Sequence, residues 1–370
     1  MAKNRLRLCY ICFDANSWHL KNWTQYFIEK GHEIHIISPT DGEIKGAIVH
    51  RSVSYGTDKF IHTILGIPNT ISLIKQIKPH IVHALGARSG FVPSLIRFTP
   101  FVVTGFGSDI LLRTKESILK KLAVKYILKH AHLITGDSKV MFNEVINISG
   151  NNSFKMILFG VNKRRFNLGV KDNELKSELG VCGQKVVLSP RSMIKNSNID
   201  IIIRSIPIVL AEIPDVVFVF KYNFGDIENE MKTLAKSLGV AERTRFIGYI
   251  GEYDKLPSFY KMSDVTVSIL SSDSSGCAWF ESIACGAPLI LSDIANSREW
   301  FENENNAVIV PLRNVEMTAK AIIKILSDKQ FAKNLVENAA PLIEVDADYY
   351  KNMEKMEKIY YDLANTYHVF

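Results

Sequence analysis

The sequence predicts an α/β protein made of two Rossmann-like domains, each built on a parallel sheet. A length of 370 residues favours two domains over one. Short apolar runs alternate with stretches of helical spacing, which implies parallel strands joined by crossover helices. This alternation restarts after a polar stretch at residues 167–183, where we place the linker and its first helix. Ligands of open parallel sheets bind beyond the carboxyl ends of the strands, so two such domains are expected to face each other across a cleft.

Thirteen apolar runs are predicted to be strands. Those of the first half are Leu6–Cys12, Glu33–Ser38, Ala47–Val53, His80–Leu85, Phe101–Thr104, His132–Thr135 and Lys155–Leu158. Those of the second half are Lys185–Ser189, Val216–Lys221, Arg243–Ile247, Val265–Leu270, Pro288–Leu291 and Ala307–Val310. Residues 1–166 are therefore predicted to form the first domain and residues 167–348 the second, with a C-terminal helix at 349–370 that crosses back to the first.

Composition narrows the class of protein. Hydrophobic residues make up 47% of the chain and charged residues 22%, as in globular proteins. No apolar run approaches the roughly 18 residues of a membrane span. The short run after the basic N-terminus lacks the features of a secretory signal. Five scattered cysteines argue against a disulfide scaffold, and the CxxC spacing of Cys9 and Cys12 falls inside a predicted strand, where packing is the simpler interpretation.

The charge is divided unequally between the two halves. Residues 1–166 contain 23 Lys and Arg against 10 Asp and Glu, a net charge of +13, whereas residues 167–370 carry −6. The first half is therefore expected to meet something anionic. Nucleic acid, a phospholipid surface and a pyrophosphate-linked substrate all satisfy this condition, but no base-stacking module or groove-reading motif supports nucleic acid.

The loop after Val265–Leu270 is the main candidate site. It is small and polar and leads into a helix predicted to begin near Cys277, where free backbone N–H groups and the helix dipole favour phosphate. The small residues Ser274, Ser275 and Gly276 would let a ligand approach the backbone.

Two carboxylates accompany this loop. Asp273 stands at its tip, and Glu281 lies about one turn into the helix, where it could accept hydrogen bonds from sugar hydroxyls. An ordinary capped helix, with Asp273 or Ser274 as N-cap and Glu281 solvated, would explain the same residues.

The flanking residues resemble the retaining glycosyltransferases of the GT-B fold, family four in the usual classification. The signature of that family is E-x7-E followed by A-x-x-C/S-G-x-P. Here Asp273 and Glu281 have that spacing and precede Ala284-Cys-Gly-Ala-Pro288; one branch of the family shares the Asp. Further similar motifs follow the family's order along nearly the whole chain: Phe159-Gly-Val-Asn162, Pro190-Arg191, Phe246-Ile-Gly248, Tyr260 with Ser263-Asp264-Val265, and Asn306.

The resemblance implies roles for the residues of the second domain. Glu281 would hold the nucleotide ribose and Asp273 the hydroxyls of the transferred sugar. Arg191 would neutralise the diphosphate leaving group, so no metal or other cofactor is required. Backbone amides would meet the sugar and the distal phosphate near Ser274, Ser275, Gly276 and Cys277, and largely backbone contacts near Tyr249 and Ile250 would meet the base.

One departure from the family concerns its basic loop. The family usually places Lys five residues after the Arg, but position 196 is Asn and Lys195 precedes it. A slip of one residue could bring Lys195 to the phosphates; a solvated loop charge is the equal alternative. Lys221 stands after the next strand, where the family has glycines, and is a possible cleft residue.

In the first domain, three loops at strand ends are candidates for the catalytic and acceptor side. His19, with Trp23, resembles the H-x-x-x-W of one branch; it could orient an acceptor or a phosphate, or simply pack at a helix start. His83 ends a strand. The motif Gly105-Phe106-Gly107-Ser-Asp109 follows the next strand, and in the family this motif lines the cleft. Phe106 would stack or shape the pocket, and Asp109 is expected to cap a helix.

Residues 111–130 contain a basic amphipathic helix pattern. Its apolar face is predicted to consist of Leu119, Leu122, Ala123, Tyr126 and Ile127. A basic stripe of Lys121, Lys125 and Lys129 at four-residue spacing, with Lys120 beside it, is predicted to bind the membrane surface. This pattern is typical of a helix that binds a membrane surface. A packed helix with a solvated lysine face is the alternative.

Together these features predict a retaining glycosyltransferase that uses a nucleoside-diphosphate sugar, UDP- or GDP-linked. The acceptor is expected to be a lipid-linked glycan or a cell-envelope polysaccharide precursor, at the cytoplasmic face of the plasma membrane. Two other hypotheses stay open: a nucleotide-sugar epimerase of the same fold, and a non-catalytic protein that binds glycans or anions.

Overall fold

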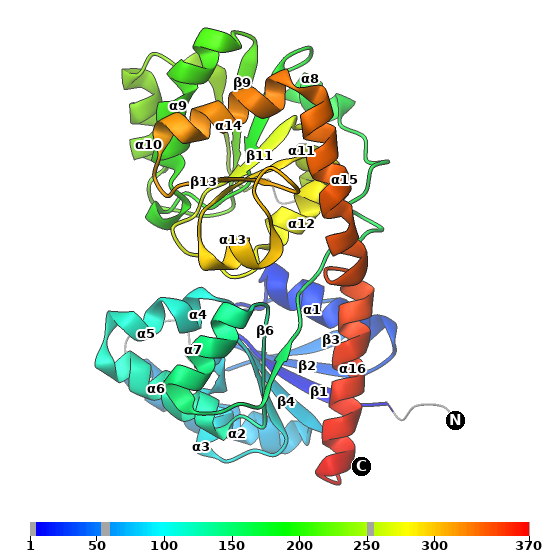
Figure 1. Cartoon of the computed structure of the whole chain (residues 1–370). Coiled ribbons are helices and arrows are strands. Elements are labelled where there is room, and N and C mark those ends of the chain that lie inside the picture. Colours follow the sequence, from blue (N-terminus) through cyan, green and yellow to red (C-terminus); the bar gives the residue numbers. More distant parts are fainter. Residues whose placement is uncertain (1–4, 53–59, 250–254, 370) are drawn as a thin grey trace. The chain divides into compact units, whose positions relative to one another are not determined.

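The structure of the protein is a computed structural model, and the residues it describes are 5–52, 60–249 and 255–369 (Figure 1). The chain divides into two compact units. Unit 1 comprises Met1–Phe159 with Tyr350–Phe370, and unit 2 comprises Gly160–Tyr349. The boundary predicted after residue 166 falls inside unit 2, because the buried ring of Phe166 packs edge-on against Tyr260 there.

Unit 1 is built on a seven-stranded sheet in the order β3-β2-β1-β4-β5-β6-β7. Every neighbouring pair is parallel. The strands are β1 Arg7–Ile11, β2 Glu33–Ser38, β3 Ala47–Arg51, β4 Ile81–Leu85, β5 Phe101–Thr104, β6 Leu133–Gly136 and β7 Phe154–Met156. All seven coincide with predicted apolar runs to within about two residues at each end, the usual uncertainty of strand ends.

The helices of unit 1 pack on this sheet around an aliphatic core. Its helices are α1 Trp18–Glu29, α2 Phe60–Ile77, η1 Ala87–Gly90, α3 Phe91–Leu95, α4 Ser108–Leu111, α5 Arg113–Glu116, α6 Ile118–His130, α7 Lys139–Ser149 and α16 Tyr349–Thr366. The strands β4 and β5 are buried along their whole length, as strands covered on both faces must be.

Buried polar contacts attach the C-terminal helix α16 to unit 1. The hydroxyl of Tyr360 lies 3.3 Å from Nε1 of Trp23 and also contacts Nδ1 of His83. One turn earlier, Glu357 Oε1 lies 2.9 Å from His32 Nε2, and both side chains are buried. Since buried polar groups must be paired to be tolerated, these contacts fix the helix in one position on the sheet.

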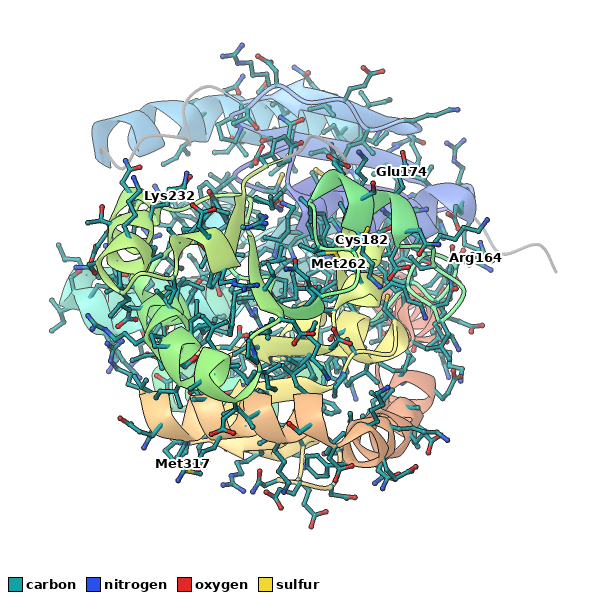
Figure 2. The ribbon with its side chains drawn as sticks, turned by 90° about the horizontal axis from the view of Figure 1, so that it is seen from above. Arg164, Glu174, Cys182, Lys232, Met262 and Met317 are labelled. Carbon is teal, nitrogen blue, oxygen red and sulfur yellow. The ribbon has the colours of Figure 1, made fainter. Side chains whose placement is uncertain are left out.

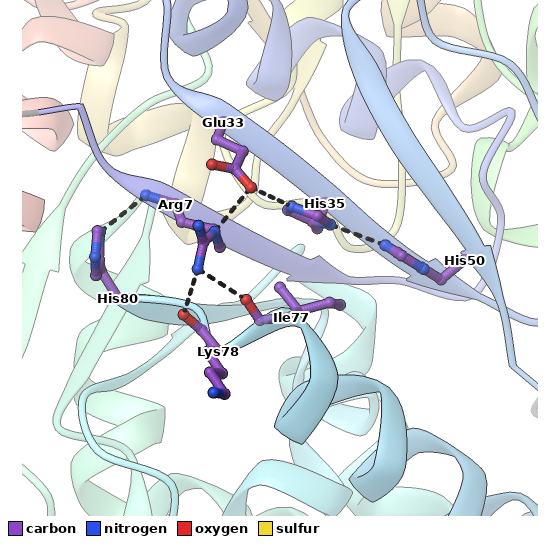
Figure 3. A network of polar contacts seen from close by, with 7 residues as sticks. All are labelled: Arg7, Glu33, His35, His50, Ile77, Lys78 and His80. Carbon is purple, nitrogen blue, oxygen red and sulfur yellow. Dashed lines mark hydrogen bonds and ion pairs between the residues drawn. The ribbon is translucent and has the colours of Figure 1, made fainter.

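A second polar network joins the first three strands of unit 1 (Figure 3). Glu33 Oε1 lies 2.8 Å from Arg7 Nε and 2.9 Å from His35 Nε2. The other ring nitrogen of His35 lies 2.9 Å from His50 Nε2 on β3, and the two imidazoles stack. The network therefore ties the edge strand β3 to β2 and β1 by side chains as well as by the backbone ladder.

Unit 2 repeats the architecture on a six-stranded parallel sheet in the order β10-β9-β8-β11-β12-β13. The strands are β8 Lys185–Ser189, β9 Val216–Lys221, β10 Thr244–Ile247, β11 Val265–Ser268, β12 Leu289–Ser292 and β13 Val308–Val310. The helices are α8 Asn173–Glu178, η2 Lys195–Ser197, α9 Ile199–Glu212, α10 Glu228–Ser237, η3 Ala241–Arg243, α11 Leu256–Met262, α12 Cys277–Ala284, α13 Ala295–Trp300, α14 Val315–Ser327 and α15 Lys329–Val345.

The interior of unit 2 is apolar. Lys232 on α10 and Met317 on α14 project outward, whereas Met262 at the end of α11 is buried (Figure 2). The strand β9, which lies between β10 and β8, is buried at all six positions.

Both sheets follow the Rossmann strand order, in which the chain starts at the middle, moves to one edge and then returns to fill the other side. The order reverses between β1 and β4 in unit 1 and between β8 and β11 in unit 2. Ligands of such sheets bind outside the carboxyl ends of the strands at this reversal. The fold therefore points to the loops after β1 and β4 in one unit and after β8 and β11 in the other.

Candidate functional site

The reversal in unit 2 carries an ion pair. Arg191 follows β8 and Asp273 follows β11, and Arg191 Nη2 lies 3.0 Å from Asp273 Oδ2. Their side chains are only 14% and 20% exposed. Burial raises the pKa of Asp273 above its ordinary value, although the Arg191 charge opposes this shift. The sequence predicted both residues separately, and the structure places them in contact.

Ser268, the last residue of β11, positions the arginine. Its Oγ accepts hydrogen bonds from Arg191 Nε at 2.7 Å and from Trp279 Nε1 at 3.0 Å. Ser268 is 1% exposed, so the guanidinium is anchored to the sheet end from within the unit. No local pattern marks this serine in the sequence, because its contact with Arg191 depends on the pairing of β8 with β11.

Position 276 favours glycine, because the ion pair of Arg191 and Asp273 lies so close to the backbone that a side chain has no room there. A Cβ atom at this position would lie 2.6 Å from Arg191 Nη2 and 2.9 Å from Asp273 Oδ2. Such distances are far below van der Waals contact. Even alanine would therefore displace the charged groups.

The helix α12 begins at Cys277, as predicted, but no side chain caps it. Its N-cap is Gly276, and Asp273 Oδ1 instead accepts a hydrogen bond from the backbone N–H of Ser274 at 2.9 Å. The interpretation of Asp273 or Ser274 as an ordinary N-cap therefore does not describe this loop. The first turn of α12 points its N–H groups toward the region next to the ion pair, as phosphate sites require.

Glu281 is buried rather than solvated, at 4% exposure. The hydroxyl of Tyr260, on α11, donates to Glu281 Oε2 at 2.9 Å. Ser275 is also held, because Trp300 Nε1 donates to its Oγ at 2.6 Å. Both functional positions are therefore fixed by aromatic side chains from neighbouring helices.

The basic loop after β8 differs from the family pattern in structure as well as in sequence. Lys195 is exposed and lines an open hollow with Asp200 and Arg204. Asn196 instead connects the two loops of the site: its Nδ2 donates to the Ser272 carbonyl at 2.7 Å. Lys195 is thus open to solvent, and its contact with a phosphate stays a prediction.

Lys221 is a buried cation at the end of β9. Its Nζ donates to the carbonyls of Tyr222 and Gly248, each at 3.0 Å, and to Asn223 Oδ1 at 2.9 Å. Burial without a carboxylate partner lowers the pKa of Lys221 to about 8. Lys221 therefore fixes the loop that leads to Tyr249. Of the two residues predicted near the base, Tyr249 is exposed and Ile250 lies outside the described residues.

In unit 1 the loop after β1 brings His19 against Phe106. The two rings stack with centroids 5.0 Å apart, and Phe159 lies 5.1 Å from the imidazole. Burial lowers the pKa of His19 to about 4, so the ring is neutral near pH 7. Its Nδ1 is buried and has no hydrogen-bond partner among the described residues. An imidazole nitrogen in this state is suited to a ligand hydroxyl.

Two other predicted residues of unit 1 have structural roles. His83 is 1% exposed, and its nitrogens contact the Tyr360 hydroxyl and Thr104 Oγ1, so it lies inside the core and not in the predicted acceptor site. Asp109 is not an N-cap, since Gly107 takes that position. Its carboxylate accepts hydrogen bonds from the N–H groups of Ala87 and Phe106 at 2.6 and 2.9 Å, which fixes the loop that carries Phe106.

The basic helix α6 is only partly as predicted. Lys121, Lys125 and Lys129 are exposed, and Lys120 pairs with Glu116. Of the predicted apolar face, Ile127 packs on the core, together with Val124 and Leu128, whereas Leu119 and Leu122 are exposed.

The described part of the chain offers neither a cluster of metal ligands nor a membrane-spanning helix. No group of three or more His, Cys, Asp and Glu side chains there could hold a metal ion. Within the same residues, no helix has the length and apolar character needed to span a bilayer.

The two units, with the charged site at the strand reversal of unit 2, form a GT-B glycosyltransferase fold. Solved structures with this fold include a sucrose-phosphate synthase from Thermosynechococcus elongatus, with a TM-score of 0.85 at 17% identity over 98% of this chain and 100% of the other. Another is Anabaena HepE in complex with UDP-glucose, with a TM-score of 0.82 at 16% identity over 97% of this chain and 100% of the other.

Family models match both units. The model "Glycosyl transferases group 1" matches residues 171–341, and "Glycosyl transferase 4-like" matches residues 7–138. The chain belongs to the group 1 glycosyltransferases. Its relatives include the "Uncharacterized glycosyltransferase MJ1607" of Methanocaldococcus jannaschii, 23% identical over 87% of each chain. The alpha-monoglucosyldiacylglycerol synthase of Acholeplasma laidlawii is 20% identical over 89% of this chain and 92% of its own.

Proposed function

We propose that this glycosyltransferase takes a sugar from a UDP- or GDP-linked donor and transfers it with retention of the anomeric configuration. The observation that carries the proposal is the largely buried group of unit 2: the ion pair of Arg191 and Asp273 at the strand reversal, and the fully buried Glu281 on the helix that follows Asp273. This group combines a cation for a diphosphate with carboxylates for hydroxyl groups. A fold neighbour, HepE, has been solved with UDP-glucose, which supports a nucleotide-sugar donor.

Each residue of this group has a role that its surroundings favour. The Arg191 guanidinium, with the N–H groups at the start of α12, stabilises the charge that develops on the leaving diphosphate. Glu281 holds ribose hydroxyls and Asp273 holds hydroxyls of the sugar. Because these groups can neutralise the leaving group without a metal ion, the reaction is expected to proceed in the presence of a chelator.

His19 is the residue of unit 1 that we propose to take part in catalysis. Its imidazole is neutral, it is held by stacking on Phe106, and its Nδ1 lacks a partner in the described structure. We assign it to hydrogen bonding with a hydroxyl of the sugar or the acceptor.

The proposed acceptor is a lipid-linked glycan or another envelope precursor. The relative from Acholeplasma laidlawii is named for the synthesis of a glycolipid, which supports this class. The net charge of +13 on residues 1–166 and the lysines of α6 fit an enzyme that works at the cytoplasmic face of the plasma membrane, in peripheral contact with anionic lipid. Family membership argues against the epimerase hypothesis.

A ligand panel tests this proposal. The thermal midpoint of the full chain is measured with nucleosides, nucleoside diphosphates and nucleotide sugars, because a ligand stabilises the state that binds it. We expect one nucleoside diphosphate and its sugar conjugate to stabilise, and the nucleoside alone to stabilise less. Incubation of that sugar conjugate without acceptor then separates the hypotheses: slow hydrolysis fits a transferase, and an epimerised sugar would overturn the proposed transfer reaction. If no ligand of the panel raised the thermal midpoint, the hypothesis of a protein that binds glycans or anions without a nucleotide would be left.

A further inference from the structure

The helix α6 presents aliphatic side chains to solvent. Ile118 and Leu119 are each 75% exposed, Leu122 is 55% exposed, and Leu112 just before α5 is 36% exposed. We call these four residues the exposed apolar patch. Single exposed aliphatic residues are ordinary on protein surfaces, but four within eleven positions of one short segment are not.

The patch is separate from the face with which α6 packs on unit 1. The residues that enter the core are Val124, Ile127 and Leu128. At 100° per residue, Ile118, Leu119 and Leu122 lie on the opposite side of the helix. The sequence pattern did not reveal this, because α6 has two apolar faces and periodicity alone does not say which is buried.

The segment that carries the exposed apolar patch is rich in cationic residues. Residues 112–129 contain six Lys and Arg and a single acidic residue, Glu116, which pairs with Lys120. Lys121, Lys125 and Lys129 follow one another at four-residue spacing along α6 and are all exposed. The solvent side of the helix therefore has an aliphatic part and a positive stripe beside it.

Ser117 sets the position of the patch on α6. It has an extended backbone and its side chain accepts from the N–H of Lys120, so α6 starts directly after it. Ile118 and Leu119 thus lie on the first turn, next to α5, and they protrude at a helix end instead of lying along a groove. Protruding aliphatic side chains with a stripe of cations beside them match the boundary between lipid headgroups and acyl chains.

We propose that the exposed apolar patch inserts into the surface of an anionic bilayer and that the lysine stripe binds its headgroups. The charge complementarity selects lipid over a second copy of this chain, because two copies of the same positive patch would repel each other. The inference deepens the proposed function, since it supplies the way in which the enzyme reaches a lipid-linked acceptor. It does not depend on the donor site.

Co-sedimentation of the full chain with vesicles tests this inference. The vesicles are phosphatidylcholine alone or phosphatidylcholine mixed with phosphatidylglycerol. We expect binding to the mixed vesicles, with a Leu119→Glu/Leu122→Glu variant weakened at least tenfold, as loss of about 1.5 kcal/mol or more of apolar burial implies. Lys121→Gln/Lys125→Gln is expected to lose only the part of the binding that depends on phosphatidylglycerol and falls with salt.

The matched control is Ile48→Glu, since Ile48 is 53% exposed on the edge strand β3 of the same unit. It should bind vesicles as the wild type does. Undiminished vesicle binding by the Leu119→Glu/Leu122→Glu variant would overturn the inference. It would also be overturned if the wild type did not bind vesicles but formed a dimer that this variant could not form. Stabilisation by a nucleoside diphosphate is measured in parallel. Its absence counts against the proposed function and not against the patch, because the two sites lie in different units.

Discussion

Arg191 and Asp273 form an ion pair that joins the ends of β8 and β11, with 3.0 Å between Nη2 and Oδ2. Each group therefore has a partner before any ligand arrives. A diphosphate would compete with Asp273 for the guanidinium, and a sugar hydroxyl would then meet a carboxylate that is already oriented. The pair accordingly holds two candidate ligand-binding groups in place at a site with little solvent.

Replacement of the arginine should separate phosphate recognition from nucleoside recognition. In Arg191→Lys the positive charge remains but the planar fork is lost, so we expect the affinity for the nucleoside diphosphate to fall about tenfold or more. The affinity for the nucleoside should change little, since Arg191 is assigned to the phosphates. Calorimetric titration of both ligands checks this, and an equal loss for the two would contradict the assignment.

Gly276→Ala tests the close approach of the ion pair to the backbone. The added methyl group would lie 2.6 Å from Arg191 Nη2, so the guanidinium must move. We expect at least a tenfold loss of diphosphate affinity with a thermal midpoint close to that of the wild type, because Gly276 has an ordinary φ of −64°. Gly169→Ala, in the linker of the same unit, is the control and should bind normally; normal binding by Gly276→Ala would show that the pair has room to shift.

Ser268→Ala tests whether the serine positions the arginine. The change removes the acceptor of both Arg191 Nε and Trp279 Nε1, which costs about 1–3 kcal/mol of stability for buried donors. Diphosphate affinity should fall while nucleoside affinity is retained, and Ser268→Thr should restore it in part because the hydroxyl returns. If Ser268→Ala lowers both affinities alike, its role is only structural.

His19 should make unit 1 sensitive to acid. Its pKa is about 4 in the folded protein against an ordinary 6.5, so the unfolded chain binds the proton more tightly. The contribution of the neutral His19 to the free energy of unfolding is complete above pH 6.5. It falls by at most about 1.4 kcal/mol per pH unit as the pH drops toward 4. His19→Phe keeps the ring contact and removes the titration, so its free energy of unfolding should depend less steeply on pH across that window. Denaturant titrations at several pH values measure this; identical slopes in both proteins would rule it out.

The same variant tests the proposed role of His19 in transfer. A phenylalanine can stack on Phe106 but offers no nitrogen to a hydroxyl group. We expect His19→Phe to bind the nucleoside diphosphate normally and to lose transfer by about a hundredfold or more, the typical contribution of a positioned proton donor or acceptor. A variant with full transfer activity would remove His19 from the site.

The sequence predicted those parts of the protein that depend on local pattern. Glu33–Ser38 and Val216–Lys221 begin and end where the apolar runs do, and α12 starts at Cys277 as its loop suggested. Asp273 and Glu281 were found by their spacing. Their partners Ser268, Tyr260 and Trp300 come from separate elements, so only the fold brings them together.

Two errors had the same physical origin. On α6 the helical spacing showed an apolar face but not that a second one, with Val124 and Leu128, enters the core. His83 at a strand end looked ligand-facing, yet α16 covers it with Tyr360, more than 270 residues later in the chain. In both cases the burial of the residues depends on packing between distant segments of the chain, which a local sequence pattern does not predict.

The central claim is that the buried group of unit 2 holds the nucleoside diphosphate of the donor, and Glu281→Gln tests it most directly. Glutamine can still accept from the Tyr260 hydroxyl, so the fold should persist while the charge that holds the ribose is lost. Calorimetric titration of UDP and GDP is carried out on the wild type, on Glu281→Gln and on Glu316→Gln, whose exposed side chain on α14 makes it the control. We predict that one of the two nucleotides binds the wild type and the control equally and binds Glu281→Gln at least about tenfold more weakly. Equal binding to all three proteins would contradict the claim.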